Sequence, residues 1–206
     1  AAKDLIASGD IGSVILGIYV PKISRWNGIW EVYNWRLGEK DMFNSFLEFF
    51  GSENKGYVKR SEDIYLDFIM NYSKESFGSG LFRVVDSNNL EYFKGLVQSC
   101  FSELSDDIRV IGFDWLGRIF VSSDTSDSKI YMCDAGSHEI LEIPLGIKEF
   151  LNNEIPEYPD ELFALDFYKE YISQGGITPS YDQCIGYKVP LFLGGLDDLS
   201  NIEQID

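Results

Sequence analysis

Residues 108–143 read IRVIGFDWLGRIFVSSDTSDSKIYMCDAGSHEILEI, and this stretch decides the fold of the chain. It contains four short segments rich in β-branched and aromatic residues, spaced about ten residues apart. Each segment is bounded by Gly, Asp or Ser clusters, which favour turns. Connections this short join antiparallel neighbours. The stretch therefore predicts an antiparallel meander, with strands at residues 108–113, 119–122, 129–134 and 139–143.

Helical periodicity flanks the meander on both sides. We expect Ser61 to be the N-cap of the second helix, with acidic residues in its first turn. A short strand is expected at residues 81–85, and a loop-rich tail after Gly176. Together these elements predict an α+β fold, a mostly antiparallel sheet with helices packed on one face. The expected helices are residues 41–50, 61–72, 89–101, 145–151 and 159–171. The third is expected to bury Leu90, Phe93, Leu96, Val97 and Cys100.

The composition is acidic and rich in core-forming residues. Of 206 residues, 45% are hydrophobic and 15% aromatic, which suffices for a packed core and excludes a disordered chain. The net charge is −17, with 27 acidic against 9 basic residues in 61–206. This charge repels phosphates and anionic lipid, so we expect neither nucleic-acid nor membrane binding. A basic protein or a cation is the better partner.

Residues 1–40 differ from the rest and are predicted to be a β-rich N-terminal extension of unknown role. Their apolar residues cluster at 14–20 and 29–35, around Pro21 and a turn-like Trp-Asn-Gly. Three of the four tryptophans, Trp26, Trp30 and Trp35, lie here, and we expect them in the core, with partner contact as the alternative. Residues 41–206 are the predicted main domain. We expect no membrane span and no signal peptide, because the longest apolar run is too short.

Few residues in the sequence could perform catalysis. His138 is the single histidine, expected in an exposed turn, and Cys100, Cys133 and Cys184 are expected as reduced thiols in a cytoplasmic protein. Gly194-Gly195 lacks the spacing of a phosphate-binding loop and precedes Asp197-Asp198, so we expect no nucleotide or other cofactor. Residues 124–127 lack the glycine and closing glutamate of a calcium loop, so no metal is expected. We expect no catalytic residues, with a carboxylate-based hydrolase as the least favoured alternative.

Acidic clusters are the candidate partner-binding residues. Solvated surface is the default interpretation of each cluster, and an acidic docking face is the alternative. Negative groups could mimic phosphate or fill a basic groove, and they would make association dependent on salt. The candidates are Asp106, Asp107, Asp124, Asp127, Glu154, Glu157, Asp160, Glu161, Asp197 and Asp198.

The sequence around Asp114 suits a tight hairpin. Asp114 and Gly117 are turn residues, and Arg118 at the start of the next strand is placed to pair with Asp114. We expect an exposed local ion pair worth about 0–1 kcal/mol. A catalytic Asp-Arg pair is the alternative.

An ordered set of motifs resembles the Tdi-like C-terminal domain of type VI secretion immunity proteins, which is related to the SUKH superfamily. The motifs are Gly80-Leu-Phe-Arg83, residues 112–120 (GFDWLGRIF), Cys133-Asp134, Ile143-Pro144, Tyr181-Asp-Gln-Cys184, residues 189–195 (VPLFLGG) and Asn201-Ile-Glu203. The resemblance implies a SUKH-like fold in which Gly112, Asp114, Gly117, Arg118, Gly194 and Gly195 define the fold and do not contact the partner.

The same resemblance implies a function in the cytoplasm without catalysis. Proteins of this family bind and neutralise a polymorphic toxin, often a nuclease, by occluding its active surface. The leading hypothesis is therefore an immunity protein whose partner is a cognate toxin. The alternative is a regulatory scaffold of the cell-wall-regulator branch of the superfamily.

Overall fold

The computed structural model describes residues 42–52, 57–123 and 129–205. The chain divides into two units, residues 1–40 and residues 41–206. The expected strands at 14–20 and 29–35, and Trp26, Trp30 and Trp35, lie outside the described residues. The helix expected at 41–50 is α3 (Asn44–Phe49), and Gly51 follows it with a φ of +61° that ends the helix.

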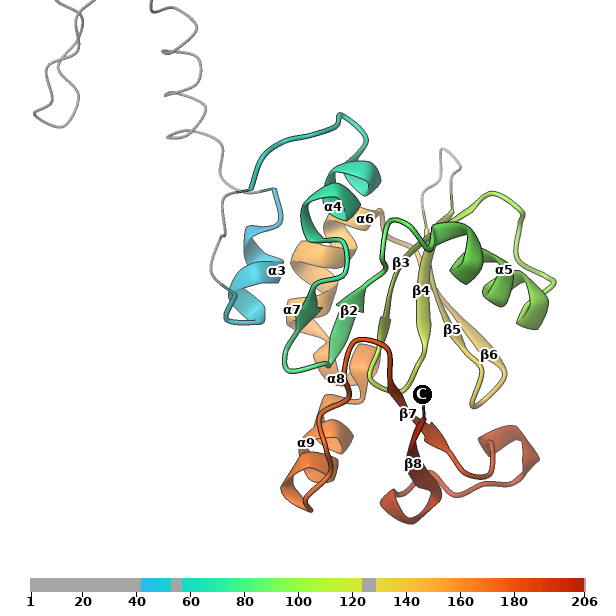
Figure 1. Ribbon diagram of the computed structural model, residues 1–206. Coiled ribbons are helices and arrows are strands. Elements are labelled where there is room, and N and C mark those ends of the chain that lie inside the picture. The colour runs from blue at the N-terminus through green and yellow to red at the C-terminus, as the bar shows by residue number, and fades with distance from the viewer. Residues whose placement is uncertain (1–41, 53–56, 124–128, 206) are drawn as a thin grey trace, which may run out of the picture. The chain divides into compact units, whose positions relative to one another are not determined.

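The described part of the chain folds around a six-stranded antiparallel sheet in the order β1-β2-β3-β4-β5-β6 (Figure 1). The predicted meander is confirmed as the last four strands, and the predicted strand at 81–85 is confirmed as β2. Helix α5 (Leu90–Cys100) connects β2 to β3 and returns the chain so that β2 pairs with β3. The strands are β1 (Ser76–Phe77), β2 (Phe82–Val84), β3 (Ile108–Asp114), β4 (Ile119–Ser123), β5 (Ile130–Asp134) and β6 (Glu139–Ile143).

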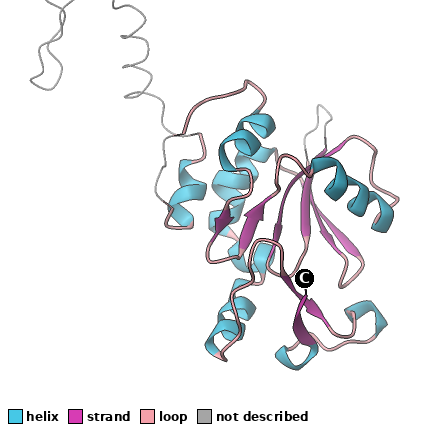
Figure 2. Cartoon of the chain, viewed as in Figure 1, coloured by secondary structure: helices cyan, strands magenta, loops and turns pink. Residues whose placement is uncertain are grey.

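Helices cover both faces of the sheet, so the predicted α+β class is confirmed but the single covered face is wrong (Figure 2). On one face, Phe120 packs against Phe150 and Phe163 from the C-terminal helices. On the other face, Phe93 of α5 (Leu90–Cys100) stacks on Phe113 at 5.3 Å. Phe113 pairs with Ile119 in the sheet, so Phe113 and Phe120 point to opposite faces.

Helix α5 buries less than its sequence predicted. Val97 is its one buried residue, whereas Leu96 and Cys100 are exposed. Phe93, Val97 and Phe101 recur every four residues and form the stripe that meets the sheet, and Leu96 lies one residue off this stripe. Because α5 is the outer layer, its remaining sides face solvent.

The helix that follows residue 60 begins later than predicted. It is α4 (Ile64–Tyr72), with Asp63 as the N-cap, whose carboxylate accepts hydrogen bonds from the backbone N–H groups of Tyr65 and Leu66. The prediction of Ser61 as the cap is wrong; its hydroxyl accepts from the Asp63 N–H instead. The Asp63 carboxylate also binds Arg109 of β3 at 2.7 Å, which favours this register of the helix.

The two helices predicted after residue 145 are both interrupted. The first is a chain of short turns, α6 (Ile147–Glu149), a π-helical turn at Phe150–Glu154 and α7 (Ile155–Glu157). The second breaks at Ala164, whose φ is +48°, into α8 (Pro159–Phe163) and α9 (Leu165–Ser173). This break frees the carbonyls of Leu162 and Phe163, which accept hydrogen bonds from Arg118 and from the Trp115 indole.

The Asp114–Arg118 pair is buried, so the prediction of an exposed ion pair is wrong. Asp114 has no exposed surface, and its carboxylate accepts three hydrogen bonds, one from the Leu116 N–H and two from Arg118. The ion pair is completed by Arg118 Nη2, which lies 2.6 Å from the same carboxylate. Burial raises the pKa of the Asp114 carboxyl, whereas the charge and hydrogen bonds of Arg118 lower it. Trp115 and α8 cover the hairpin, and this cover excludes water from the pair.

Arg83 completes a buried cluster with Asp114 and Arg118. Its guanidinium lies 4.7 Å from the centre of the Phe113 ring and donates to the carbonyls of Asp114, Ser180 and Gln183. Burial lowers the pKa of Arg83, and the nearby Asp114 opposes this shift. The cluster joins β2 and the β3–β4 hairpin to the segment that leads into the C-terminal strands.

The tail predicted to be loop-rich contains a second sheet of two antiparallel strands, β7 (Cys184–Tyr187) and β8 (Ile202–Ile205). It lies beyond the end of the large sheet where the β3–β4 hairpin turns (Figure 1). The Ile185 N–H donates to the Trp115 carbonyl at 2.7 Å, so this sheet is attached directly to the hairpin.

We predict that Asp114→Ala lowers the free energy of unfolding by about 3–5 kcal/mol, because two buried arginines lose their counter-charge. Urea unfolding followed by circular dichroism measures this. Asp166→Ala is the matched control, since Asp166 pairs with Lys169 at 2.8 Å on the surface, and it should cost about 1 kcal/mol or less. Equal losses in the two variants would contradict a structural role for the buried cluster.

Candidate functional site

The candidate acidic residues lie on separate parts of the fold. Asp106 and Asp107 are exposed between α5 and β3, where Asp106 accepts a hydrogen bond from Gln98 at 3.1 Å. Asp107 immediately precedes β3, whereas the β3–β4 hairpin and the C-terminal sheet lie at the opposite end of that strand. Asp124 and Asp127 lie outside the described residues. The structure therefore does not bring all the candidates together.

Four candidates do share one surface, which we call the acidic ridge. Glu154, Glu157, Asp160 and Glu161 follow one another along the turns from the π-helical segment through α8, with Glu157, Asp160 and Glu161 exposed. Residues 149–168 contain six acidic residues and no basic residue. Asp160 also has a structural role, because its carboxylate accepts the Asp166 N–H at 2.8 Å across the break at Ala164.

Tyr158 lies in the middle of the acidic ridge, and its pKa responds to the negative charges around it. Its ring is partly exposed, and its hydroxyl donates to Glu157 at 3.2 Å. The negative charge of Glu157 raises the pKa of Tyr158, and the charges of Glu154 and Glu161 add to this shift. Tyrosine is a frequent anchor in protein interfaces, and here it is surrounded by carboxylates that suit a basic partner.

Asp197 and Asp198 belong to a different surface, the connection between β7 and β8. Asp197 accepts a hydrogen bond from the Tyr187 hydroxyl at 2.7 Å. Asp198 is the N-cap of a short 3-10 turn, Leu199–Asn201, and hydrogen bonds from Ser200 lower the pKa of its carboxyl. Both residues are exposed.

The glycines assigned to the fold occupy crowded or left-handed positions. A Cβ at Gly112 would overlap the Arg83 carbonyl, and one at Gly195 would overlap the Val189 carbonyl. Gly117 and Gly194 have φ of +78° and +90°, which glycine adopts without strain. Gly117 also lies against Cys184, so the hairpin can approach β7 closely.

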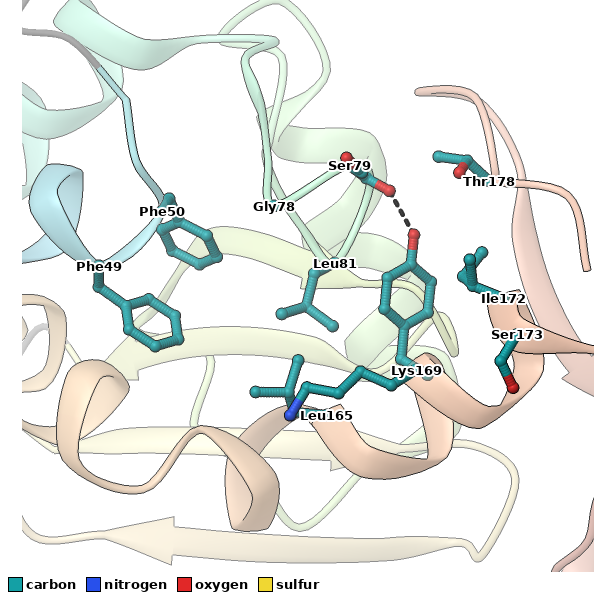
Figure 3. Close-up of a pocket in the computed structure, with 11 residues that line it drawn as sticks. Phe49, Phe50, Gly78, Ser79, Leu81, Leu165, Lys169, Ile172, Ser173 and Thr178 are labelled. Carbon is teal, nitrogen blue, oxygen red and sulfur yellow. Dashed lines mark hydrogen bonds between the residues drawn. The ribbon is translucent and has the colours of Figure 1, made fainter.

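A cavity of about 600 Å³ opens between α3, the β1–β2 turn and α9 (Figure 3). Its walls are mainly apolar, and Lys169 is the one charged residue among the described residues that line it. The Tyr168 hydroxyl donates to the Ser79 carbonyl at one side. The lining residues are Phe49, Phe50, Gly78, Ser79, Leu81, Leu165, Tyr168, Lys169, Ile172, Ser173 and Thr178. This lining contains no carboxylate pair for the hydrolase considered above.

A smaller cavity of about 230 Å³ lies between α5 and the start of β3. Glu91, Lys94, Asp107 and Arg109 contribute charged groups of both signs to its walls. Tyr65 forms its buried side and donates to the Val110 carbonyl at 3.0 Å. Burial is the largest effect on this phenol and raises its pKa to about 12.

The cysteines and the histidine are not arranged as nucleophile and base. Cys133 is buried in the sheet, and burial raises its pKa to about 12, which disfavours the reactive thiolate. Burial also raises the pKa of the Cys184 thiol. His138 is exposed in the β5–β6 turn, as predicted, with its ring against Phe101 and Phe192.

The described residues show neither a metal-binding cluster nor a membrane-spanning helix. They contain no group of three or more His, Cys, Asp or Glu side chains that could hold a metal ion. None of the helices described is long and apolar enough to cross a membrane.

Sequence reasoning missed the apolar residues that the structure exposes on the β7–β8 connection. The exposed large apolar residues are Val189, Phe192, Leu193 and Leu196, although the sequence motif at residues 189–195 predicted only a role in the fold. A signal was present, because a run of apolar residues interrupted by Pro190 and Gly194-Gly195 suits neither a helix nor a strand. Tyr158 was also missed, although it stands between candidate acids.

Comparison with known proteins yields a structural similarity but no match in sequence. No sequence profile of a known family matches the chain. No characterised protein matches it in sequence. The fold is similar to the crystal structure of Atu4351 from Agrobacterium tumefaciens, with 19% identity, 80% of this chain and 84% of that chain covered, and a TM-score of 0.49.

We predict that Tyr65→Phe makes the protein less sensitive to alkaline pH. The Tyr65 pKa is 10.0 in an unperturbed chain and about 12 in the fold, so the neutral phenol is favoured when folded. The resulting stability is complete below pH 10 and is lost as the pH rises to about 12. Urea unfolding across this range should show Tyr65→Phe losing less than wild type, by about 2–3 kcal/mol.

Tyr92→Phe is the control, because Tyr92 is an exposed tyrosine of α5. It should keep the pH dependence of the wild-type protein. If Tyr65→Phe also keeps it, the Tyr65 phenol ionises as easily in the fold as in the unfolded chain.

Proposed function

We propose that this chain is an immunity protein, which binds a cognate protein toxin in the cytoplasm of the producing cell and occludes the toxin's active surface. Two observations support the proposal: the ordered motifs that resemble the Tdi-like immunity domain, and the surface of the main domain. The single observation that carries most weight is the acidic ridge around Tyr158.

The ridge suits a toxin that itself binds phosphate. A nuclease presents lysines and arginines toward the phosphates of its substrate. Carboxylates placed like phosphates can occupy that basic groove and accept charge-assisted hydrogen bonds from its arginines. The four carboxylates of the acidic ridge provide such a surface. Occupation of the groove excludes the substrate, so inhibition needs no chemistry by the immunity protein.

Co-expression in a bacterial host tests the function. Each toxin candidate encoded beside this gene is induced alone and together with the chain. We expect one candidate to stop growth and the chain to restore it. Failure to restore growth against every toxic neighbour would overturn the proposal.

We predict that the acidic ridge accelerates association with the toxin. Glu157→Lys/Glu161→Lys should slow association at least about tenfold at low salt, because steering by complementary charge raises the association rate. The difference should shrink as the ionic strength rises past about 0.15 M, where the Debye length is about 8 Å. Surface plasmon resonance at several salt concentrations measures this.

Glu62→Lys/Glu91→Lys is the matched control, since both residues are exposed, Glu91 lies on α5, and the change in net charge is identical. It should slow association much less than the ridge variant. If the two double variants slow association equally, the net charge of the whole chain determines the association rate. The ridge is then not the surface that faces the toxin.

A further inference from the structure

Four large apolar side chains project from one short loop of the C-terminal sheet. We call residues 188–199, which form most of the connection between β7 and β8, the apolar loop. Val189, Phe192, Leu193 and Leu196 are 46%, 55%, 68% and 64% exposed, respectively. A group of apolar side chains exposed to water is unfavourable compared with the same side chains buried, and on soluble domains such groups mark interaction sites.

The apolar loop is held in place by its own hydrogen bonds. The buried Asn201 side chain donates to the Val189 and Leu196 carbonyls and accepts from the Val189 N–H, at 2.8 to 3.0 Å. The Lys188 N–H donates to the Asn201 carbonyl at 2.7 Å. One side-chain amide therefore fixes both ends of the segment that bears the exposed residues.

The apolar loop is also attached to the large sheet. The Leu191 N–H donates to the Gly136 carbonyl in the β5–β6 turn at 2.9 Å. The Phe192 ring packs against His138 of the same turn, with ring centres 5.8 Å apart. The Gly195 backbone passes so close to Val189 that a side chain would not fit. A loop fixed in this way loses little conformational entropy on binding.

Charge decides between a second copy of the chain and a different partner. Leu196 is followed directly by the exposed Asp197 and Asp198, and the whole chain carries a net charge of −17. A second copy would place the same carboxylates opposite each other, and like charges at an interface oppose binding. An anionic lipid surface is repelled for the same reason. A basic protein with an apolar pocket complements both the leucines and the aspartates.

We infer that the apolar loop is the desolvated contact of this protein with its toxin, with Phe192, Leu193 and Leu196 inserted into an apolar pocket that has a basic rim. The inference rests on the proposed function and names the binding surface for it. The acidic ridge and the apolar loop then have different kinetic roles. Long-range charge sets the association rate, whereas the buried apolar contact sets the lifetime of the complex.

Leu193→Asp tests the inference, because Leu193 is exposed. Phe192 is less suitable for substitution, since its ring packs against His138 and supports the loop. The purified toxin from the growth assay is the probe, and surface plasmon resonance measures both rates. We expect Leu193→Asp to dissociate at least tenfold faster than wild type, with an association rate within about threefold. Ile177→Asp is the matched control, because Ile177 has the same 68% exposure, and it should bind like wild type. Thermal unfolding within a few degrees of wild type shows that each variant is folded.

The outcomes separate the inference from the proposed function. If wild type restores growth and Leu193→Asp dissociates as slowly as wild type, the apolar loop is not the contact, although the immunity function stands. If the chain alone sediments as a dimer that Leu193→Asp dissociates, a second copy occupies the loop and the inference is overturned. If wild type neither restores growth nor binds any neighbouring toxin, the proposed function itself is wrong.

Discussion

The buried Asp114 carboxylate is the constraint on which the rest of the structure depends. A carboxylate without exposed surface must be satisfied by donors, and Arg118 with the turn's own N–H groups supplies them. Because Arg118 also reaches the Leu162 carbonyl, and Trp115 the Phe163 carbonyl, the helix after Pro159 must end there. Ala164 then takes a left-handed conformation and the chain restarts as α9. A local ion pair in one hairpin therefore determines where a distant helix breaks.

The same hairpin positions the C-terminal part of the fold. Trp115 accepts the Ile185 N–H, Gly117 lies against Cys184, and Arg83 holds the carbonyls of Ser180 and Gln183. These contacts fix β7, and β7 with β8 fixes the apolar loop between them. The surface proposed to bind the toxin is thus attached to the buried polar cluster of Arg83, Asp114 and Arg118. Binding surfaces on rigid scaffolds retain more of their interaction free energy, since less is lost to ordering.

Part of this structure could be predicted from the sequence, and the rest depends on long-range contacts. The meander was predictable because its strands are short, β-rich and bounded by turn residues. The break at Ala164 was not, because alanine is the best helix former and the carbonyls freed by the break bind Arg118 and Trp115, over forty residues away. The burial of Asp114 was missed because the spacing in the sequence shows only that Arg118 lies near Asp114. It does not show that Trp115 and α8 cover the pair. The choice of Asp63 over Ser61 as N-cap depends on Arg109 in a distant strand.

The candidate surfaces divide in the same way. The acidic residues near Tyr158 are neighbours along the chain, so their clustering was predictable. Whether Asp106 and Asp197 share a face depends on which end of β3 each one adjoins, and spacing does not contain that information.

Hydrogen-deuterium exchange of the chain with and without its toxin tests the central claim most directly. We expect slower exchange on binding in the apolar loop and unchanged exchange in α5. Slower exchange in α5 or around the 600 Å³ cavity, with none in the apolar loop, would contradict it.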